Sequence, residues 1–246
     1  MSLVNSYVSE SGFAGPSQTS SITSDVTFYG LALEGNNNQD IVRVMNSDDC
    51  FRLFLLNTTN QNQLTAFINQ TANNINRQFP VGLSTSAGLL VANPAYGGDP
   101  VYAANFTNNA YHGTVIWGWP LAMMAAGLDR QLSRCNSSAA PAFCTDRAVY
   151  SNVRAAYNRL WDEIEANSAQ LSSEVWSFVY RNNAFQTVPL GSLPPPPGSN
   201  PTGTSCLTRS CKAVSMEQTD ADRSCRERHP PAVEFDLPGR DQRPSA

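Results

Sequence analysis

Apolar residues recur at steps of three and four positions along much of the chain, with polar residues between them. This spacing gathers apolar side chains on one face of an α-helix, where they can pack into a core. Breaks rich in serine, asparagine, glycine and proline separate the stretches. The pattern predicts a helical protein, with helices over residues 50–56, 64–79, 121–132 and 149–164 and a shorter helical segment over 171–180.

The ends of these predicted helices carry signals of their own. The triplet Ser47-Asp48-Asp49 offers short polar side chains that can cap the first helix. Pro80 ends the second pattern, because proline has no backbone N–H to donate. Pro120 suits the first turn of the third helix, and Thr145 can cap the fourth. Antiparallel helix pairs joined by long loops predict an all-α architecture of helical hairpins.

Residues 81–109 interrupt the helical pattern with four glycines and two prolines. A loop of this length is longer than a simple connection needs, so we expect it to have a functional role. Along the helix over 149–164, the apolar stripe is predicted to be core, and the nearby acids Asp162, Glu163 and Glu165 are expected on a solvated face.

Both ends of the chain differ from its body. Residues 1–24 are polar and lack the basic start and apolar stretch of a signal peptide. Four consecutive prolines mark a linker over residues 192–202. Residues 203–246 contain no asparagine, against 23 in residues 1–202, and no periodic apolar stripe. We expect this tail to be disordered, either as a regulated segment or as the product of translation in another reading frame.

The charge pattern argues against two classes of partner. Net charge is −4, charged residues make up 15% of the chain, and the only lysine is Lys212. Phosphate contacts and attraction to anionic lipid both need basic residues, which the body lacks in clusters. No apolar run reaches the roughly 18 residues that a membrane span requires. We therefore expect no nucleic acid and no membrane as partner. We separately expect a monomer that uses no cofactor.

Glycosylation sequons suggest an extracellular origin. Four Asn-X-Ser/Thr triplets occur, although a chain rich in these residues also forms them by chance. They begin at Asn57, Asn69, Asn105 and Asn136. We expect a secreted ancestor whose signal peptide lies outside this chain.

Two cysteines in the body bracket a short loop. Cys135 and Cys144 flank eight residues rich in serine, alanine and proline, between two predicted helices. A local disulfide is one reading of this pair, and two free buried thiols are the other. Because the cysteines are far apart along the chain and only two histidines exist, we expect no metal site.

The segment over residues 111–120 concentrates the candidate chemistry. Tyr111, His112, Trp117 and Trp119 stand within nine residues, and Trp176 follows about sixty residues later. Tyrosine and tryptophan offer an apolar face and a polar edge, which suits a sugar ring, and histidine can donate to a sugar hydroxyl. The alternative is that the aromatic residues and His112 are structural parts of the core.

Glu174 is the candidate catalytic carboxylate. Glycoside hydrolysis generally needs two carboxyl groups, separated in inverting enzymes by roughly 6.5–9.5 Å. If Asp25, Asp99 or another acid lay at that distance across a cleft, catalysis would be credible. The alternative is an ordinary glutamate exposed on a helix.

Two segments resemble the glycogen-debranching, amylo-α-1,6-glucosidase type of glycoside hydrolases, which are six-hairpin, (α/α)6-toroid enzymes. Residues 110–120, AYHGTVIWGWP, are similar to a YHxGTVWxW segment of that family, and residues 173–177, SEVWS, are similar to its SEIFD segment. Residues 93–96, NPAY, resemble secreted fungal members. The resemblance covers residues 25–191.

This resemblance implies inverting hydrolysis of an α-glucosidic bond in an oligo- or polysaccharide. It implies Glu174 as general base, with Tyr111, His112, Trp117, Trp119 and Trp176 near the substrate. The family's general acid is expected earlier in the toroid, and its closing helix is replaced here by the proline run. We therefore expect an incomplete toroid, weakly stable and weakly active or inactive. The alternative is a noncatalytic carbohydrate-binding or structural helical domain.

Overall fold

A computed structural model describes residues 2–10, 25–33, 40–55 and 60–194, all within one compact unit, Met1–Asn200. The tail 203–246, most of the proline linker, part of the N-terminal segment 1–24 and the sequon at Asn57 lie outside the described residues. About half of the described chain is helical, which confirms the prediction of a mainly helical protein. Its six helices are α1 Ser2–Glu10, α2 Asp49–Leu55, α3 Gln61–Asn76, α4 Pro100–Asn105, α5 Gly118–Ser133 and α6 Arg147–Ala166.

Four of these helices lie where the apolar spacing predicts them, with small differences at their ends. Helix α3 stops at Asn76, before Phe79, because Arg77 takes an extended conformation. Helix α6 is capped by Asp146 and not by Thr145: the Asp146 carboxylate accepts from the backbone N–H groups of Ala148 and Val149 at 3.1 and 3.2 Å. Thr145 instead donates its hydroxyl to the Ala142 carbonyl.

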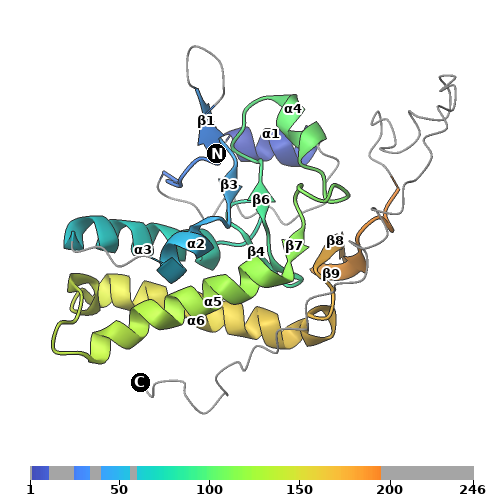
Figure 1. Cartoon of the computed structure of the whole chain (residues 1–246). Helices are drawn as coiled ribbons and strands as arrows, with labels where there is room; N and C mark the ends of the chain where they lie inside the picture. The colour runs from blue at the N-terminus through green and yellow to red at the C-terminus, as the bar shows by residue number, and fades with distance from the viewer. Residues whose placement is uncertain (1, 11–24, 34–39, 56–59, 195–246) are drawn as a thin grey trace, which may run out of the picture. The chain divides into compact units, whose positions relative to one another are not determined.

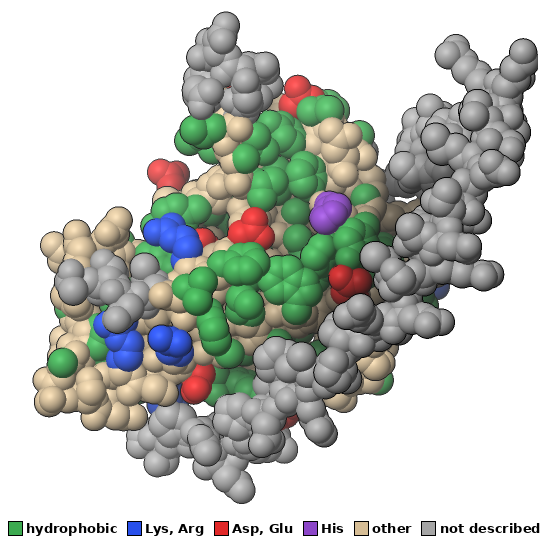
Figure 2. Space-filling view, in the orientation of Figure 1, with side chains coloured by type: hydrophobic (Ala, Val, Ile, Leu, Met, Phe, Trp, Pro, Cys, Tyr) green, Lys and Arg blue, Asp and Glu red, His purple; other side chains and the backbone are tan. Residues whose placement is uncertain are grey.

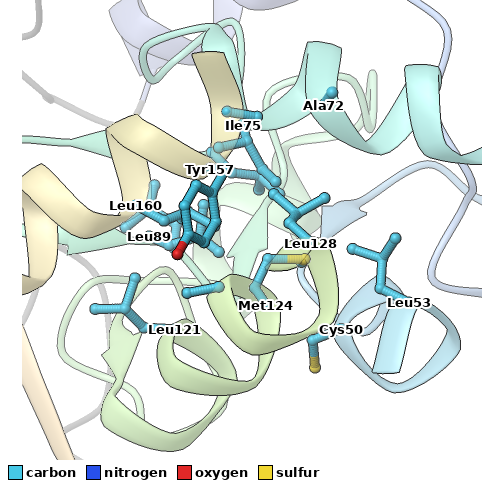
Figure 3. Close-up of a cluster of buried hydrophobic side chains, with 14 of the residues drawn as sticks. Cys50, Leu53, Ala72, Ile75, Leu89, Leu121, Met124, Leu128, Tyr157 and Leu160 are labelled. Carbon is cyan, nitrogen blue, oxygen red and sulfur yellow. The ribbon is translucent and has the colours of Figure 1, made fainter. Parts of the chain in front are cut away.

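The helices pack as pairs around one core (Figures 1 and 3). Helix α2 lies on α5, α3 lies on α6, and α5 runs beside α6. The α2–α5 approach is close at Gly127, where an added Cβ would lie 2.8 Å from the Leu53 Cβ. The buried cluster draws side chains from all four helices and from β5, including Leu53, Ile75, Leu89, Met124, Leu128 and Leu160.

A disulfide joins the ends of the α5–α6 hairpin. It links Cys135, in the short 3₁₀ turn after α5, to Cys144, in the turn before α6, and their Cα atoms lie 5.4 Å apart. Cys50 is a free thiol in the core, and burial raises its pKa to about 12, so it stays protonated and inert. Among the described helices, none has the length and apolar character needed to cross a bilayer.

Small antiparallel sheets occur beside the helices, which an all-α prediction does not include. Three are two-stranded pairs: β1 Ala32–Leu33 with β2 Ile41–Val42, β3 Met45–Asn46 with β6 Ala92–Asn93, and β4 Ser84–Thr85 with β5 Gly88–Leu89. The fourth has three strands in the order β7 Ile116–Trp117, β8 Val175–Arg181 and β9 Ala184–Pro189. The predicted loop 81–109 thus contains strands β4 to β6 and helix α4.

The prediction of a helical segment over 171–180 is wrong. Most of it is strand β8, which pairs with β9 over Trp176–Arg181. Aromatic and β-branched residues favour a pleated strand over a helix. Asn182 and Asn183 both adopt positive φ angles, 53° and 59°, as a two-residue hairpin turn requires. No closed ring of hairpins is present in the described part of the chain, so the toroid stays a proposal.

Candidate functional site

Pairing between β7 and β8 brings together residues 110–120 and residues 173–177, the two segments that carry the candidate chemistry. Trp117 faces Val175 in the antiparallel register, and Ile116 faces Trp176. One step further, the Gly118 N–H donates to the Glu174 carbonyl at 2.9 Å. The sheet therefore fixes Glu174 beside the start of α5, although more than fifty residues separate them in the chain.

A hydrogen bond ties Glu174 to the aromatic segment. The Tyr111 hydroxyl donates to Oε1 of Glu174 at 2.7 Å. Both side chains are exposed. This hydrogen bond, with smaller contributions from desolvation and from the negative charge of Glu174, raises the pKa of Tyr111. Because one carboxylate oxygen takes the tyrosine hydrogen, Oε2 remains for a ligand or a water molecule.

An aromatic strip extends from this hydrogen bond across the surface. We define the aromatic strip as Tyr111, His112, Trp117, Trp119 and Phe51. Successive ring centroids lie 4.8 Å apart for Tyr111–Trp117, 5.7 Å for Trp117–Trp119 and 5.4 Å for Trp119–Phe51. The His112 ring lies 4.9 Å from Tyr111 and 5.4 Å from Trp117. Figure 2 shows hydrophobic side chains gathered across this face, with a histidine and acidic side chains among them.

The strip is open to solvent. Phe51 is 44% exposed, and Tyr111 and Trp119 are each 39% exposed. His112 is also exposed, which rules out the alternative of a histidine buried in the core. Contiguous exposed apolar surface is typical of interaction sites, whereas single exposed rings are ordinary.

The backbone beneath the strip is tightly fixed. The Trp117 indole N–H donates to the Tyr111 carbonyl at 3.0 Å, which sets the orientation of that indole. Thr114 is buried and donates to the Phe106 carbonyl at 2.7 Å. Gly113 cannot carry a side chain, because an added Cβ would lie 2.0 Å from the Thr107 carbonyl oxygen. The backbone of this segment and the Trp117 indole are therefore held in place without a ligand.

Trp176 does not belong to the strip, contrary to the expectation from the sequence. Its side chain is 1% exposed, and its indole N–H donates to the Ala87 carbonyl at 2.8 Å. It is a core residue that packs near Gly88. Trp176 pairs with the buried Ile116, whereas Trp117 of the strip pairs with Val175. Because successive side chains of a strand point to opposite faces, Trp176 and Trp117 lie on opposite sides of the sheet.

Phe51 is a member of the strip that sequence reasoning missed. It lies on α2 between the buried residues Cys50 and Leu53, but it faces solvent. A large aromatic side chain placed off the apolar stripe of its helix is the signal that could have found it. Asp48 lies three residues before Phe51, and burial raises the pKa of its carboxyl.

A second carboxyl group across a cleft from Glu174 stays a prediction. Within the described ranges, no hydrogen bond or ion pair joins its carboxylate to another acid or base, apart from Tyr111. Asp99 caps helix α4, accepting from the Val101 N–H at 2.9 Å, and Asp25 is exposed. Across the same residues, no group of three His, Cys, Asp or Glu side chains is arranged to hold a metal ion.

The described sequons differ in exposure. Asn105, at the end of α4, and Asn136, beside the disulfide, are exposed. Asn69 is half-buried on α3, and its side-chain carbonyl accepts from Asn152 of α6 at 2.8 Å. Glycosylation therefore stays a prediction that fits Asn105 and Asn136 better than Asn69.

No protein-family model, curated protein or solved structure matches this chain.

Proposed function

We propose that the aromatic strip binds carbohydrate and that Glu174 acts beside it as the general base of an inverting glycoside hydrolase. The observation that carries this proposal is the 2.7 Å hydrogen bond from Tyr111 to Glu174, because it places a carboxylate at one end of a row of exposed rings. The resemblance of residues 110–120 and 173–177 to debranching-type glycosidases supports an α-glucosidic bond as target and an (α/α)6 ancestry for the helical hairpins.

The chemistry of the rings supports a sugar as ligand. The face of an indole or phenol packs against the C–H face of a sugar ring, while polar edges reach its hydroxyls. Trp119 and Phe51 offer exposed faces, and His112 offers ring nitrogens at the edge of the strip. Several rings in a row can hold successive units of an oligosaccharide.

Glu174 has the features that a general base needs. One of its oxygens is held by Tyr111, which orients the carboxylate, and the other can accept a proton from a water molecule. In an inverting mechanism that water attacks the anomeric carbon, while a separate acid protonates the leaving oxygen.

Binding without hydrolysis is the second candidate function. The exposure of Glu174 favours it, because catalytic charges act most strongly where water is excluded. Both candidates place the sugar on the same strip, so they differ only in whether the bond breaks.

Turnover of an α-1,6-linked glucose disaccharide by the full chain and by Glu174→Gln distinguishes the two. The proposal predicts measurable release of glucose by the wild type and a loss of about 100-fold or more in Glu174→Gln, with disaccharide binding retained. Glu165→Gln, which alters an exposed glutamate on α6, is the matched control and should keep full turnover. Equal turnover in wild type and Glu174→Gln would refute the base assignment, and binding with no turnover in any variant would select the second candidate.

A further inference from the structure

A polar cavity lies between α3, β4 and α6, apart from the aromatic strip. Its volume is about 480 Å³, which is within the range of pockets that hold small ligands. Ser84 and Thr85 of β4 line it on one side, and Asn158, Arg159, Asp162 and Glu163 of α6 line it on another.

Glu163 is buried in the wall of this cavity, which corrects the expectation of a solvated helix face. Its side chain is 6% exposed, and neither carboxylate oxygen has a hydrogen-bond partner among the described residues. The nearby Ser84 hydroxyl gives its hydrogen to the Ile75 carbonyl at 2.6 Å. A buried carboxyl group without a partner is costly, so native structures seldom keep one without a reason.

Burial raises the pKa of Glu163 to about 8. Arg159 lowers this pKa and Asp162 raises it, but burial outweighs both, and the Ser84 hydroxyl is directed at the Ile75 carbonyl instead. Besides Glu163, the lining carries one cation, Arg159, and one anion, Asp162, and its other polar side chains are neutral amides and hydroxyls. With Glu163 ionised, the described lining residues carry one net negative charge.

We propose that this cavity binds a small organic monocation whose primary ammonium group pairs with the Glu163 carboxylate and whose hydroxyls meet the surrounding amide and hydroxyl side chains. An ammonium group supplies three donors, enough to reach both unpartnered oxygens. Hydrogen bonds between charged partners are roughly twice as strong as those between neutral ones. A neutral polyol lacks the positive charge that strengthens hydrogen bonds to the Glu163 carboxylate.

Binding of the cation requires Glu163 to lose its proton. Near pH 7 the buried carboxyl group is mostly protonated, so an ammonium ligand must displace about one proton as it binds. Affinity should therefore rise close to tenfold for each pH unit between about pH 6 and the pKa of Glu163, and level off above it.

The probes for this proposal are 1-amino-1-deoxysorbitol and sorbitol, which differ only in the amino group. Isothermal titration of the full chain at pH 8 should show binding of the amine and at least tenfold weaker binding of sorbitol. Glu163→Gln keeps the size of the side chain and should abolish amine binding, whereas Glu165→Gln and Glu174→Gln should bind the amine as the wild type does. Equal binding of both probes, no amine binding, or amine binding that survives Glu163→Gln would overturn the proposal.

The pH dependence in the wild type tests the proposal even if Glu163→Gln fails to fold. The amine stays protonated up to pH 8, as an aliphatic ammonium of pKa about 10 does. Its affinity should increase between pH 6 and pH 8 with release of about one proton, seen as a buffer-dependent heat. An affinity that is flat with pH would overturn the assignment to Glu163. Because the proposal does not involve the aromatic strip, its outcome is independent of sugar binding there.

Discussion

At the scale of single residues, the contact between Tyr111 and Glu174 fixes the geometry of the proposed site. The tyrosine hydroxyl lies 2.7 Å from the carboxylate, and this hydrogen bond raises the pKa of Tyr111. A tyrosine next to a carboxylate resists ionisation, because the phenolate would face a like charge and lose its acceptor. The contact also holds the carboxylate at a fixed place beside the rings.

Glu174→Gln should therefore lower the pKa of Tyr111 toward its ordinary value. The glutamine carbonyl can still accept the hydroxyl hydrogen, but the negative charge is gone. The chemical shift of the Tyr111 Cζ carbon, followed against pH, measures this change. An unchanged Tyr111 titration would show that the two side chains do not meet in solution.

Residue types alone predicted part of this site. The four aromatic and imidazole side chains of residues 111–119 do lie together on the surface, as their density in the sequence suggests. Trp176 does not join them. The pairing register of β7 and β8 decides which side of the sheet its side chain occupies, and the sequence pattern did not reveal that register. Phe51 joins from α2 through tertiary packing between α2 and α5, and no local pattern specifies that contact.

At the scale of elements, the helical spacing of apolar residues predicted helices α2, α3, α5 and α6. The N-cap residue determines where α6 begins. At the start of α6 two candidate caps stand side by side, Thr145 and Asp146. The carboxylate of Asp146 accepts from two backbone N–H groups, while the Thr145 hydroxyl points back to the preceding turn. The first turn of α6 thus depends on Asp146.

Asp146→Ala should reduce the free energy of unfolding by about 1 kcal/mol, the usual cost of losing an N-cap. Thr145→Ala should cost clearly less, because it removes one hydroxyl contact and leaves the cap in place. Urea denaturation followed by far-UV circular dichroism measures both. A larger loss for Thr145→Ala than for Asp146→Ala would contradict the observed cap.

The sheets were the part of the fold that periodicity could not predict. Strands β1 to β7 are two residues long, too short to show an alternating pattern, and tertiary contacts determine their pairing. Strand β8 is long enough, but Trp176, Ser177 and Phe178 are all buried, so polar and apolar residues do not alternate along it. The turn at Asn182-Asn183 was the available signal for a hairpin, since asparagine tolerates positive φ.

At the scale of the whole molecule, buried acids link stability to pH. Burial raises the pKa of Glu163 to about 8 and that of Asp49 to about 6. A carboxyl group whose pKa is raised in the folded state holds its proton more tightly there than in the unfolded chain. Its contribution to stability is full below the unfolded pKa of about 4.3 and is lost as pH rises through the folded pKa.

The free energy of unfolding should therefore fall as pH rises from 5 to 8, by up to about 1.4 kcal/mol per pH unit for the Glu163 proton. Asp49 adds to the fall only up to about pH 6. Glu163→Gln should flatten the curve between pH 6 and pH 8, with Arg159 and Asp162 still in place on α6. Chemical denaturation at a series of pH values gives the curve. A stability that increases with pH over this range would show that Glu163 is ionised in the folded protein.

If a sugar binds on the aromatic strip and not elsewhere, the four tryptophans of the chain report this directly. Trp117 and Trp119 lie in the strip, whereas Trp176 is buried in the core and Trp161 lies on α6 beside Tyr157. The decisive measurement follows the four indole N–H signals by NMR while an α-1,6-linked glucose oligosaccharide is added to the full chain. The account predicts saturable shifts for Trp117 and Trp119 and none for Trp161 and Trp176. Four unmoved signals, or shifts confined to Trp161 and Trp176, would contradict it.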